Sequence, residues 1–349
     1  MAKRMMKAAV YAGPGNVVIQ ERPVPEPGPG DVLVRVRACG ICGSDVNALH
    51  SEAAEMQPGT ILGHESAGEV ESVGEGVSGF SGGERVVIEP LLTCGKCSCC
   101  ISGRDSICRS LRILGVHTDG AFAEYVVAPA RRLYRIPDAL DFRTASLIEP
   151  VSVAVHGLRL GGFQKDMRVL VFGAGIIGLA AVAAARAWGA KEVLLAARYP
   201  HQAKLGYACG ASRVLMEDQS TAGALDALAR ETPITLVADT VGHAGTLAAA
   251  GAAIEPGGTI VELGLTLAPV PIPGLTLLHK EARLQWANCY SSRASGHSDF
   301  EESMRLLQQD PMLWTLMMTD RVPLDEIRRG FELAANRMAG TVKVTVAMN

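Results

Sequence analysis

A chain of 349 residues is longer than one ordinary hydrophobic core supports, so the sequence predicts about two domains. Hydrophobic residues make up 48% of the chain, and 33 Lys and Arg residues nearly balance 36 Asp and Glu residues, which argues against a nucleic-acid partner. The N-terminus lacks the apolar run of a signal peptide, and the later apolar stretches are broken well short of a membrane span. We therefore expect a cytosolic protein with no membrane partner.

Roughly the first 150 residues are expected to form a mainly β domain with loop excursions. Apolar and polar residues alternate over Asp31–Ala38, Glu69–Val73 and Glu84–Ile88, which predicts short strands. Between such segments, Gly and Pro recur, and Pro23–Gly30 reads as a turn-rich loop.

Candidate ligands for a catalytic metal are scattered through this half of the chain. They are a thiol, an imidazole and two carboxylates: Cys42, His64, Glu65 and Glu149. Mixed ligands of these types can leave one coordination position open for chemistry. Taken one by one, each residue could equally be structural, and periodicity cannot bring them together.

A second group of candidate ligands is compact. The chain has nine cysteines, and this odd number without an export signal favours metal ligation or buried thiols over a disulfide framework. Four of them are spaced 2-2-7, and four thiolates can close a tetrahedral shell around structural Zn²⁺. We assign this shell to Cys94, Cys97, Cys100 and Cys108. Cys99 is left out because adjacent ligands have poor geometry.

The pattern changes from Arg168 onward to apolar strand, glycine turn, Ala-rich helix and apolar strand, which is typical of a βαβ unit. We expect a strand at Arg168–Phe172, a turn at Gly173–Gly178, a helix at Leu179–Trp188 and a strand at Glu192–Ala197. The turn has the Gly-x-Gly-x-x-Gly spacing whose backbone N–H groups receive a dinucleotide pyrophosphate. Its candidate binding residues are Gly173, Gly175, Ile176, Ile177 and Gly178.

The end of the second strand indicates which dinucleotide is preferred. A carboxylate is expected there for NAD(H), but the sequence reads Ala197-Arg198. A small residue followed by Arg suits the 2′-phosphate of NADP(H), with His201 or Lys204 as a second donor. The alternative is that Arg198 is a solvated residue at a strand end and that the protein discriminates little between NADP(H) and NAD(H).

The alternation of strands and helices continues to about Tyr290, and the elements predicted after it do not belong to the same series. Strands are expected at Ile234–Ala238, Thr259–Leu263 and Arg283–Ala287. Beyond Tyr290 we expect helices at Asp299–Gln309 and Leu324–Asn336 and a last strand at Thr341–Val346.

A longer run, Gly63–Val86, resembles the zinc signature of the medium-chain alcohol dehydrogenase superfamily. The resemblance extends to the four-cysteine lobe, the glycine turn and the Gly340–Val344 ending, so it covers nearly the whole chain. Within the superfamily the chain is most similar to the sorbitol, threonine and butanediol dehydrogenases, because Glu149-Pro150 stands where typical alcohol dehydrogenases have a second cysteine ligand.

The resemblance implies a catalytic Zn²⁺ held by Cys42 and His64, with Glu65 or Glu149 completing the shell directly or through water. It also implies that Ser44 hydrogen-bonds the substrate oxygen and starts a proton relay. Asn47 stands where this branch often has His, so His50 is the candidate to continue that relay. The implied reaction is hydride transfer between NADP(H) and a secondary alcohol, polyol or amino-alcohol.

The fold that the resemblance implies is α/β. A GroES-like β domain is expected at residues 1–153 and 291–349, with a zinc lobe at about 90–110, and a Rossmann domain is expected at 154–290. Branch membership also suggests a homotetramer, or failing that a homodimer. The alternatives are an NAD-using threonine- or sorbitol-type enzyme, a non-catalytic nucleotide- and metal-binding sensor, and a zinc-independent enoyl reductase, which would need neither metal group.

Overall fold

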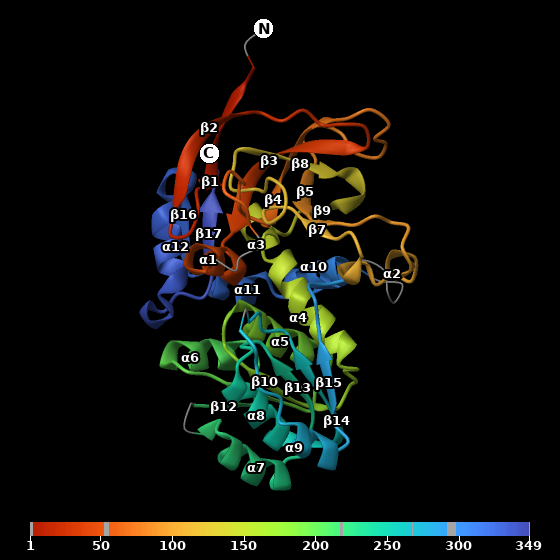
Figure 1. Ribbon diagram of the computed structural model, residues 1–349, viewed down its shortest axis with the longest axis vertical. Helices are drawn as coiled ribbons and strands as arrows, with labels where there is room; N and C mark the ends of the chain where they lie inside the picture. The colour runs from red at the N-terminus through yellow and green to blue at the C-terminus, as the bar shows by residue number, and fades with distance from the viewer. Residues whose placement is uncertain (1–2, 52–55, 217–218, 267, 292–297, 349) are drawn as a thin grey trace. The chain divides into compact units, whose positions relative to one another are not determined.

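The computed structural model describes residues 3–51, 56–216, 219–266, 268–291 and 298–348. The chain divides into two compact units (Figure 1): Met1–Glu149 with Ser292–Asn349, and Pro150–Ser291. The first division falls within α4 (Ile148–Leu160), a few residues before the boundary expected at 153/154.

The first unit is organised around a mostly antiparallel sheet of seven strands in its described residues. The path runs β16-β17-β3-β4-β5-β9, and β8 also pairs with β3. Buried Val, Leu, Ile and Phe side chains on this sheet form its core. The strands are β3 (Asp31–Gly40), β4 (Glu65–Val73), β5 (Arg85–Ile88), β8 (Tyr125–Pro129), β9 (Leu133–Arg135), β16 (Asp320–Pro323) and β17 (Val344–Ala347).

Two small hairpin-like sheets and several short helices complete the first unit. The sheets pair β1 (Met5–Tyr11) with β2 (Val17–Pro23) and β6 (Leu91–Leu92) with β7 (Arg112–Ile113). The α-helices are α1 (Gly43–His50), α2 (Ser98–Ile101), α3 (Phe142–Ala145), α10 (Asp299–Gln309), α11 (Pro311–Met317) and α12 (Ile327–Ala335). The 3₁₀ turns are η1 (Asp105–Ile107), η2 (Ala130–Arg132), η4 (Leu324–Glu326) and η5 (Arg337–Ala339).

The second unit is a parallel sheet of six strands in its described residues, in the order β12-β11-β10-β13-β14-β15. The strands are β10 (Arg168–Phe172), β11 (Glu192–Ala196), β12 (Arg213–Leu215), β13 (Ile234–Asp239), β14 (Ile254–Glu262) and β15 (Arg283–Trp286). The order reverses between β10 and β13, and in such sheets ligands bind outside the carboxyl ends of the strands at this switch point.

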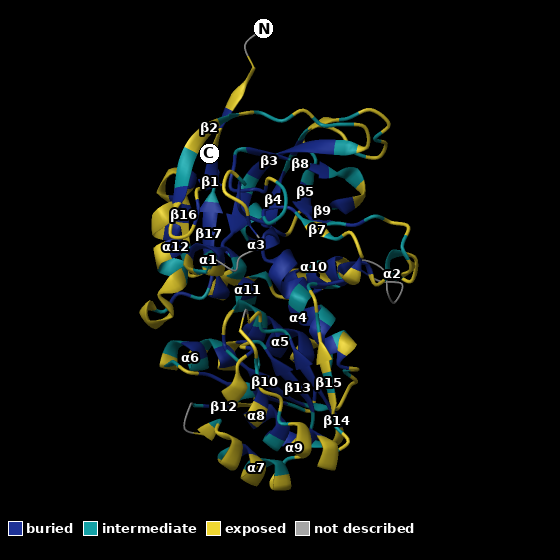
Figure 2. Cartoon of the chain, viewed as in Figure 1, coloured by how far each residue is buried: buried dark blue, intermediate teal, exposed yellow. Residues whose placement is uncertain are grey.

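Helices connect the strands of the second unit. They are α5 (Ile176–Ala187), α6 (Pro200–Ala208), α7 (Ala222–Glu231), α8 (Ala244–Ala253) and α9 (Gly274–His279). The central strands are buried, whereas α7 and α9 are largely exposed (Figure 2). This burial explains the continuous apolar runs of β10 and β13, because strands covered on both faces carry no polar alternation.

Most element predictions lie within a few residues of the observed bounds, and β10 and α10 coincide with theirs. One prediction of a turn was wrong: α5 already begins at Ile176, so the last glycine of the predicted turn lies inside the helix. The predicted helix at Leu324–Asn336 is a 3₁₀ turn followed by α12. Among the described residues, no helix combines the length and the apolar character that crossing a membrane requires.

Candidate active site and metal centres

The first candidate metal site is built from two segments of the first unit. Cys42 is the N-cap residue of α1, Glu65 begins β4, and His64 directly precedes it. The ligand atoms of these three residues lie within 4.8 Å of one another. Gly63 turns the chain into this position with φ of +91°, where a Cβ atom would lie 2.7 Å from the ring of Phe122. The local chain is therefore shaped to bring the thiol, imidazole and carboxylate together.

The Asp45 carboxylate lies next to two members of this group. Its Oδ2 accepts a hydrogen bond from the backbone N–H of Cys42 at 3.0 Å, and its Oδ1 lies 3.7 Å from Nδ1 of His64. Burial lowers the pKa of His64, but the Asp45 carboxylate and the Cys42 thiol raise it well above its ordinary value. The negative charge that surrounds this imidazole suits a bound cation, so the residues fit a metal ion.

Lys343 is a functional neighbour that the sequence reasoning missed. Its side chain is 2% exposed, and its Nζ lies 2.6 Å from Oε1 and 2.5 Å from Oε2 of Glu65. The same ammonium donates to the carbonyl oxygen of Ile41 at 2.9 Å. Gly40 leaves the space for this carboxylate, because any Cβ there would overlap Oε2 of Glu65. Lys343 therefore neutralises and positions the carboxylate beside Cys42 and His64.

The other catalytic candidates occupy different places around this group. Glu149 is buried and acts on His64 electrostatically, but it is not part of the close group of ligand atoms found among the described residues. Ser44 lies in the first turn of α1, two residues after Cys42, and is half-buried. His50 is exposed at the end of the same helix. Six helical positions, a rise of about 9 Å, separate Ser44 from His50, so these side chains do not face each other.

The structure brings the second group, Cys94, Cys97, Cys100 and Cys108, together and leaves Cys99 outside it. Sγ of Cys97 lies 3.5 Å from Sγ of Cys100 and 4.0 Å from Sγ of Cys108. Sγ of Cys94 lies 4.0 Å from Sγ of Cys100. A tetrahedral shell with Zn–S bonds of about 2.3 Å requires sulfur atoms about 3.8 Å apart, so these thiols fit structural Zn²⁺.

Backbone amides prepare this group to carry negative charge. N–H groups of Cys100 and Arg109 lower the pKa of the Cys97 thiol to about 6. Burial and a hydrogen bond with the neighbouring thiol of Cys97 raise the pKa of Cys100 to about 12. A divalent cation bound by the four sulfur atoms would favour their thiolate forms.

A buried ionic cluster ties the four-cysteine lobe to the main sheet of the same unit. The Arg132 guanidinium donates to Asp105 in the lobe at 2.9 Å and also contacts Glu89 and Thr93. Burial raises the pKa of Glu89 to about 7, although the Arg132 charge opposes this rise. The hydroxyl of Tyr134 donates to Oε2 of Glu89 at 2.8 Å. The lobe is thus held by Arg132 of η2 in addition to its cysteines, and Glu89 links the same cluster to Tyr134 of β9.

The glycine turn of the second unit meets the requirements of a dinucleotide site. Gly173 has φ of +91°, and a Cβ on Gly178 would overlap its carbonyl oxygen, so these two glycines serve the turn and its packing. A Cβ on Gly175 would instead meet nothing within 4 Å. The chain itself therefore does not require glycine at 175, and the open space there would let a pyrophosphate approach the backbone. Ile176 and Ile177 follow in the first turn of α5, whose N-cap provides no side-chain hydrogen bond.

Arg198, His201 and Lys204 gather at the carboxyl end of β11 and the start of α6. The Arg198 guanidinium lies over the ring of Tyr199, with 5.7 Å between Cζ and the ring centroid. The same ring stacks on His201 at 5.6 Å between centroids. The Gln202 side chain accepts the backbone N–H groups of Arg198 and Tyr199, which fixes this turn. Arg198 and Lys204 are exposed.

Comparisons with known proteins find two family matches along the chain. Residues 28–138 match the family described as alcohol dehydrogenase GroES-like domain, and residues 177–309 match the family described as zinc-binding dehydrogenase. Together with the parallel sheet, these matches define an α/β dehydrogenase and confirm the predicted fold class: a GroES-like β-rich domain and a Rossmann domain.

Individual relatives narrow this class to one family. The chain is 33% identical over 328 residues to L-threonine 3-dehydrogenase of Bacillus licheniformis, covering 92% of each chain. RspB alcohol dehydrogenase of Escherichia coli CFT073, solved with NADH, has a TM-score of 0.90 and 28% identity over 98% of this chain and 99% of that one. A putative zinc-binding dehydrogenase of Sinorhizobium meliloti, bound to NADP, has a TM-score of 0.88 and 32% identity over 99% and 100%.

The chain therefore belongs to the zinc-dependent medium-chain alcohol dehydrogenase superfamily, as its resemblance predicted. It is an oxidoreductase of the dehydrogenase class and acts on a small molecule.

Proposed function

We propose that this protein transfers hydride between NADP(H) and a secondary alcohol, polyol or amino-alcohol and its ketone, with one catalytic and one structural zinc ion per chain. The observation that carries the proposal is the close grouping of Cys42, His64 and Glu65 in a chain that also carries the four-cysteine group and the glycine turn. A zinc-independent reductase would need neither group of metal ligands.

Each residue of the catalytic group has a distinct task in this proposal. Cys42 and His64 hold the zinc ion, and Glu65 or Glu149 completes its shell directly or through water. When bound, zinc supplies a Lewis acid that stabilises negative charge on the substrate oxygen. Asp45 places a carboxylate beside the His64 ring, and Lys343 holds the Glu65 carboxylate. The hydroxyl of Ser44 accepts the proton of the substrate hydroxyl as it donates its own proton to water. That water passes the proton to bulk solvent or to His50, which does not face Ser44 and can be reached only through water.

A panel of alcohols and ketones tests the substrate class. We expect absorbance changes at the reduced-nicotinamide band with secondary alcohols, polyols or amino-alcohols and NADP(H). Turnover of primary aliphatic alcohols alone would contradict the proposed class. Since pocket residues come from several loops, small substitutions there decide between polyol and aliphatic substrates.

Arg198 is proposed to bind the 2′-phosphate that distinguishes NADP(H) from NAD(H). Replacing it by alanine is expected to weaken NADPH binding by about 10- to 100-fold, as for a lost charge-assisted hydrogen bond, and to leave NADH binding nearly unchanged. Fluorescence titration with both cofactors measures the two dissociation constants. Arg213→Ala is the matched control, because Arg213 is exposed at the opposite, amino end of the adjacent strand β12. Equal losses for both cofactors in Arg198→Ala would favour the NAD-using alternative.

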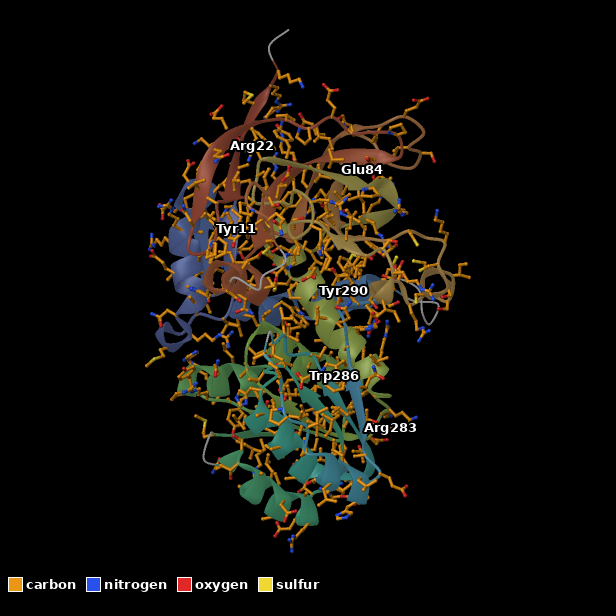
Figure 3. All side chains as sticks on the ribbon, in the orientation of Figure 1. Tyr11, Arg22, Glu84, Arg283, Trp286 and Tyr290 are labelled. Carbon is orange, nitrogen blue, oxygen red and sulfur yellow. The ribbon has the colours of Figure 1, made fainter. Side chains whose placement is uncertain are left out.

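We further propose that the protein forms at least a homodimer through β15, the edge strand of the second sheet. Edge strands present unpaired backbone groups that pair readily with another strand. β15 is exposed along most of its length (Figure 2), and Figure 3 labels Arg283 and Trp286 on it. Trp286 is 53% exposed, and Leu275 and Leu278 of the preceding helix are 67% and 70% exposed. Exposed apolar side chains on the strand that ends this sheet among the described residues, and on the helix before it, suit a second copy.

Charge introduced on this edge is expected to break the dimer. Trp286→Glu should shift the mass measured by light scattering after size exclusion to that of one chain, because a buried unpaired carboxylate opposes association. Leu316→Glu on α11 is the control, since Leu316 has a similar exposure of 52% in the first unit. A Trp286→Glu variant that keeps the native mass would refute this interface.

The thiolates of both proposed zinc sites also require a reducing compartment, and for this reason we propose that the protein lies in the cytosol.

A further inference from the structure

Two buried carboxyl groups lie side by side in the second unit and have no part in the proposed chemistry. Asp239 ends β13 and Glu262 ends β14, and these residues are register partners in the parallel pair. Register partners on neighbouring strands point to the same face of a sheet. Asp239 is fully buried and Glu262 is 5% exposed. Two carboxylates so close in a buried place repel each other unless one of them holds a proton.

The charged groups around the pair do not offset the repulsion between its two carboxylates. Burial and then the neighbouring Asp239 carboxylate raise the pKa of Glu262 to about 8, and burial raises the pKa of Asp239 as well. The Thr246 hydroxyl and, to a smaller extent, the His243 imidazole at the start of α8 lower the pKa of Asp239. Among the described residues, no donor makes a hydrogen bond of good geometry to Oδ2 of Asp239. A proton on Glu262 is the donor that this oxygen lacks.

The pair also holds the two loops that leave these strands. Oδ1 of Asp239 accepts the N–H groups of Val241 at 2.9 Å and Gly242 at 3.3 Å. Oε1 of Glu262 accepts the N–H group of Gly264 at 2.8 Å. The loops meet at these glycines, because a Cβ on Gly264 would overlap the backbone nitrogen of Gly242. Separation of the two carboxyl groups would therefore move both loops.

The first of these loops lies against the glycine turn. The Thr240 hydroxyl donates to the carbonyl oxygen of Phe172 at 2.7 Å, directly before that turn. A Cβ on Gly173 would lie 2.6 Å from Oγ1 of Thr240, and a Cβ on Gly178 would lie 3.2 Å from it. Thr240 thus contacts both outer glycines of the dinucleotide turn. Any shift of the loop is transmitted to that turn.

We propose that Asp239 and Glu262 share one proton, and that this protonated pair positions the loop that supports the dinucleotide turn. Loss of the proton in alkaline solution leaves two negative charges together, displaces residues 240–242 and weakens dinucleotide binding. The effect on binding rests on the proposed use of a dinucleotide, whereas the shared proton does not. Glu262 is a positioning residue in this account, since it acts through Asp239 and the loop.

Glu262→Gln tests the proposal, because its amide donates a hydrogen bond to Asp239 at every pH. The dissociation constant for NADPH is measured by fluorescence from about pH 6 to about pH 9.5. In the unmodified protein it is expected to rise above about pH 8, approaching tenfold per pH unit for one linked proton, and to stay flatter there in Glu262→Gln. Glu255→Gln, on the same strand, is the control and should follow the unmodified protein. Equal slopes in the unmodified protein and Glu262→Gln would overturn the proposal.

Thermal unfolding without cofactor gives an independent reading. The folded protein keeps a proton that an unfolded Glu, with its ordinary pKa of 4.5, has already released. The free energy of unfolding contributed by Glu262 therefore falls as the pH rises from this value to about 8. The melting temperature of the unmodified protein should fall over this range relative to Glu262→Gln, and parallel curves would refute the shared proton. If no dinucleotide binds at any pH, the proposed cofactor and its link to the pair fail, while the melting curves still decide whether the proton is shared.

Discussion

Replacement of His64 by alanine is expected to lower kcat/KM by on the order of 10³-fold or more while the protein stays folded. The residue is buried beside Cys42 and Glu65, and it is proposed to hold the catalytic zinc. Loss of a metal that stabilises the developing charge raises the free energy of the transition state by several kcal/mol. Each increment of about 1.4 kcal/mol lowers the rate tenfold. Steady-state kinetics measure this loss, and circular dichroism with thermal melting establishes that the fold is retained.

Two further variants separate a catalytic loss from a general one. Cys42→Ala should reproduce the effect of His64→Ala, because both remove a proposed ligand of the same ion. His50→Ala should lose much less, since His50 is exposed and does not face Ser44. Metal analysis of His64→Ala should find about one zinc ion per chain instead of two, the remaining one in the four-cysteine lobe. Normal turnover in either ligand variant would refute the assignment of Cys42 and His64.

Replacement of Cys97 by alanine is expected to act on stability rather than directly on chemistry. Its sulfur lies within 4.0 Å of those of Cys100 and Cys108, so its loss opens the proposed tetrahedral shell. The binding free energy of a structural zinc site is also folding free energy of the segment that it orders. We expect the lobe around residues 94–108 to become sensitive to protease and the melting temperature to fall by several degrees, as a loss of a few kcal/mol does in a chain of this size.

The chain provides its own control for this experiment. Cys99 lies between two of the proposed ligands but outside their group, so Cys99→Ser should keep both zinc ions and the native melting temperature. The Arg132 contacts to Asp105 and Glu89 also hold the lobe, so it should loosen in Cys97→Ala without unfolding the main sheet. The opposite pattern, a stable Cys97→Ala and a zinc-deficient Cys99→Ser, would mean that the wrong thiol was excluded.

Local patterns predicted the elements well wherever a strand or helix follows from its own residues. The apolar run of β10, the glycines after it and the Ala-rich helix predicted a dinucleotide-binding unit from local sequence alone, and the structure has the strand and the helix there. The start of α5 was placed too late, because glycines that normally terminate helices here occupy its N-cap and first turn. The 2-2-7 cysteine spacing is equally local, and the structure groups the same four residues.

Contacts between distant segments could not be predicted in this way. Lys343 and Glu65 are 278 positions apart, and only the pairing of β17 with β3, and of β3 with β4, brings them together. The sequence did contain a hint, since a Lys in an otherwise apolar terminal strand is expensive to bury without a partner. Asp239 and Glu262 were missed for a similar reason: each reads as a polar strand end, and only the register of β13 and β14 makes them neighbours.

The most direct test of the central claim is the turnover of NADP(H) with a secondary alcohol or ketone before chelation, after chelation and after the return of Zn²⁺. The account predicts activity that is lost when the catalytic metal is removed and restored when zinc is added back, with NADP(H) preferred over NAD(H). Turnover that persists after both metal sites are emptied would contradict the assignment of Cys42, His64 and Glu65. No turnover with any substrate, despite bound zinc and dinucleotide, would instead favour a non-catalytic sensor of the same fold.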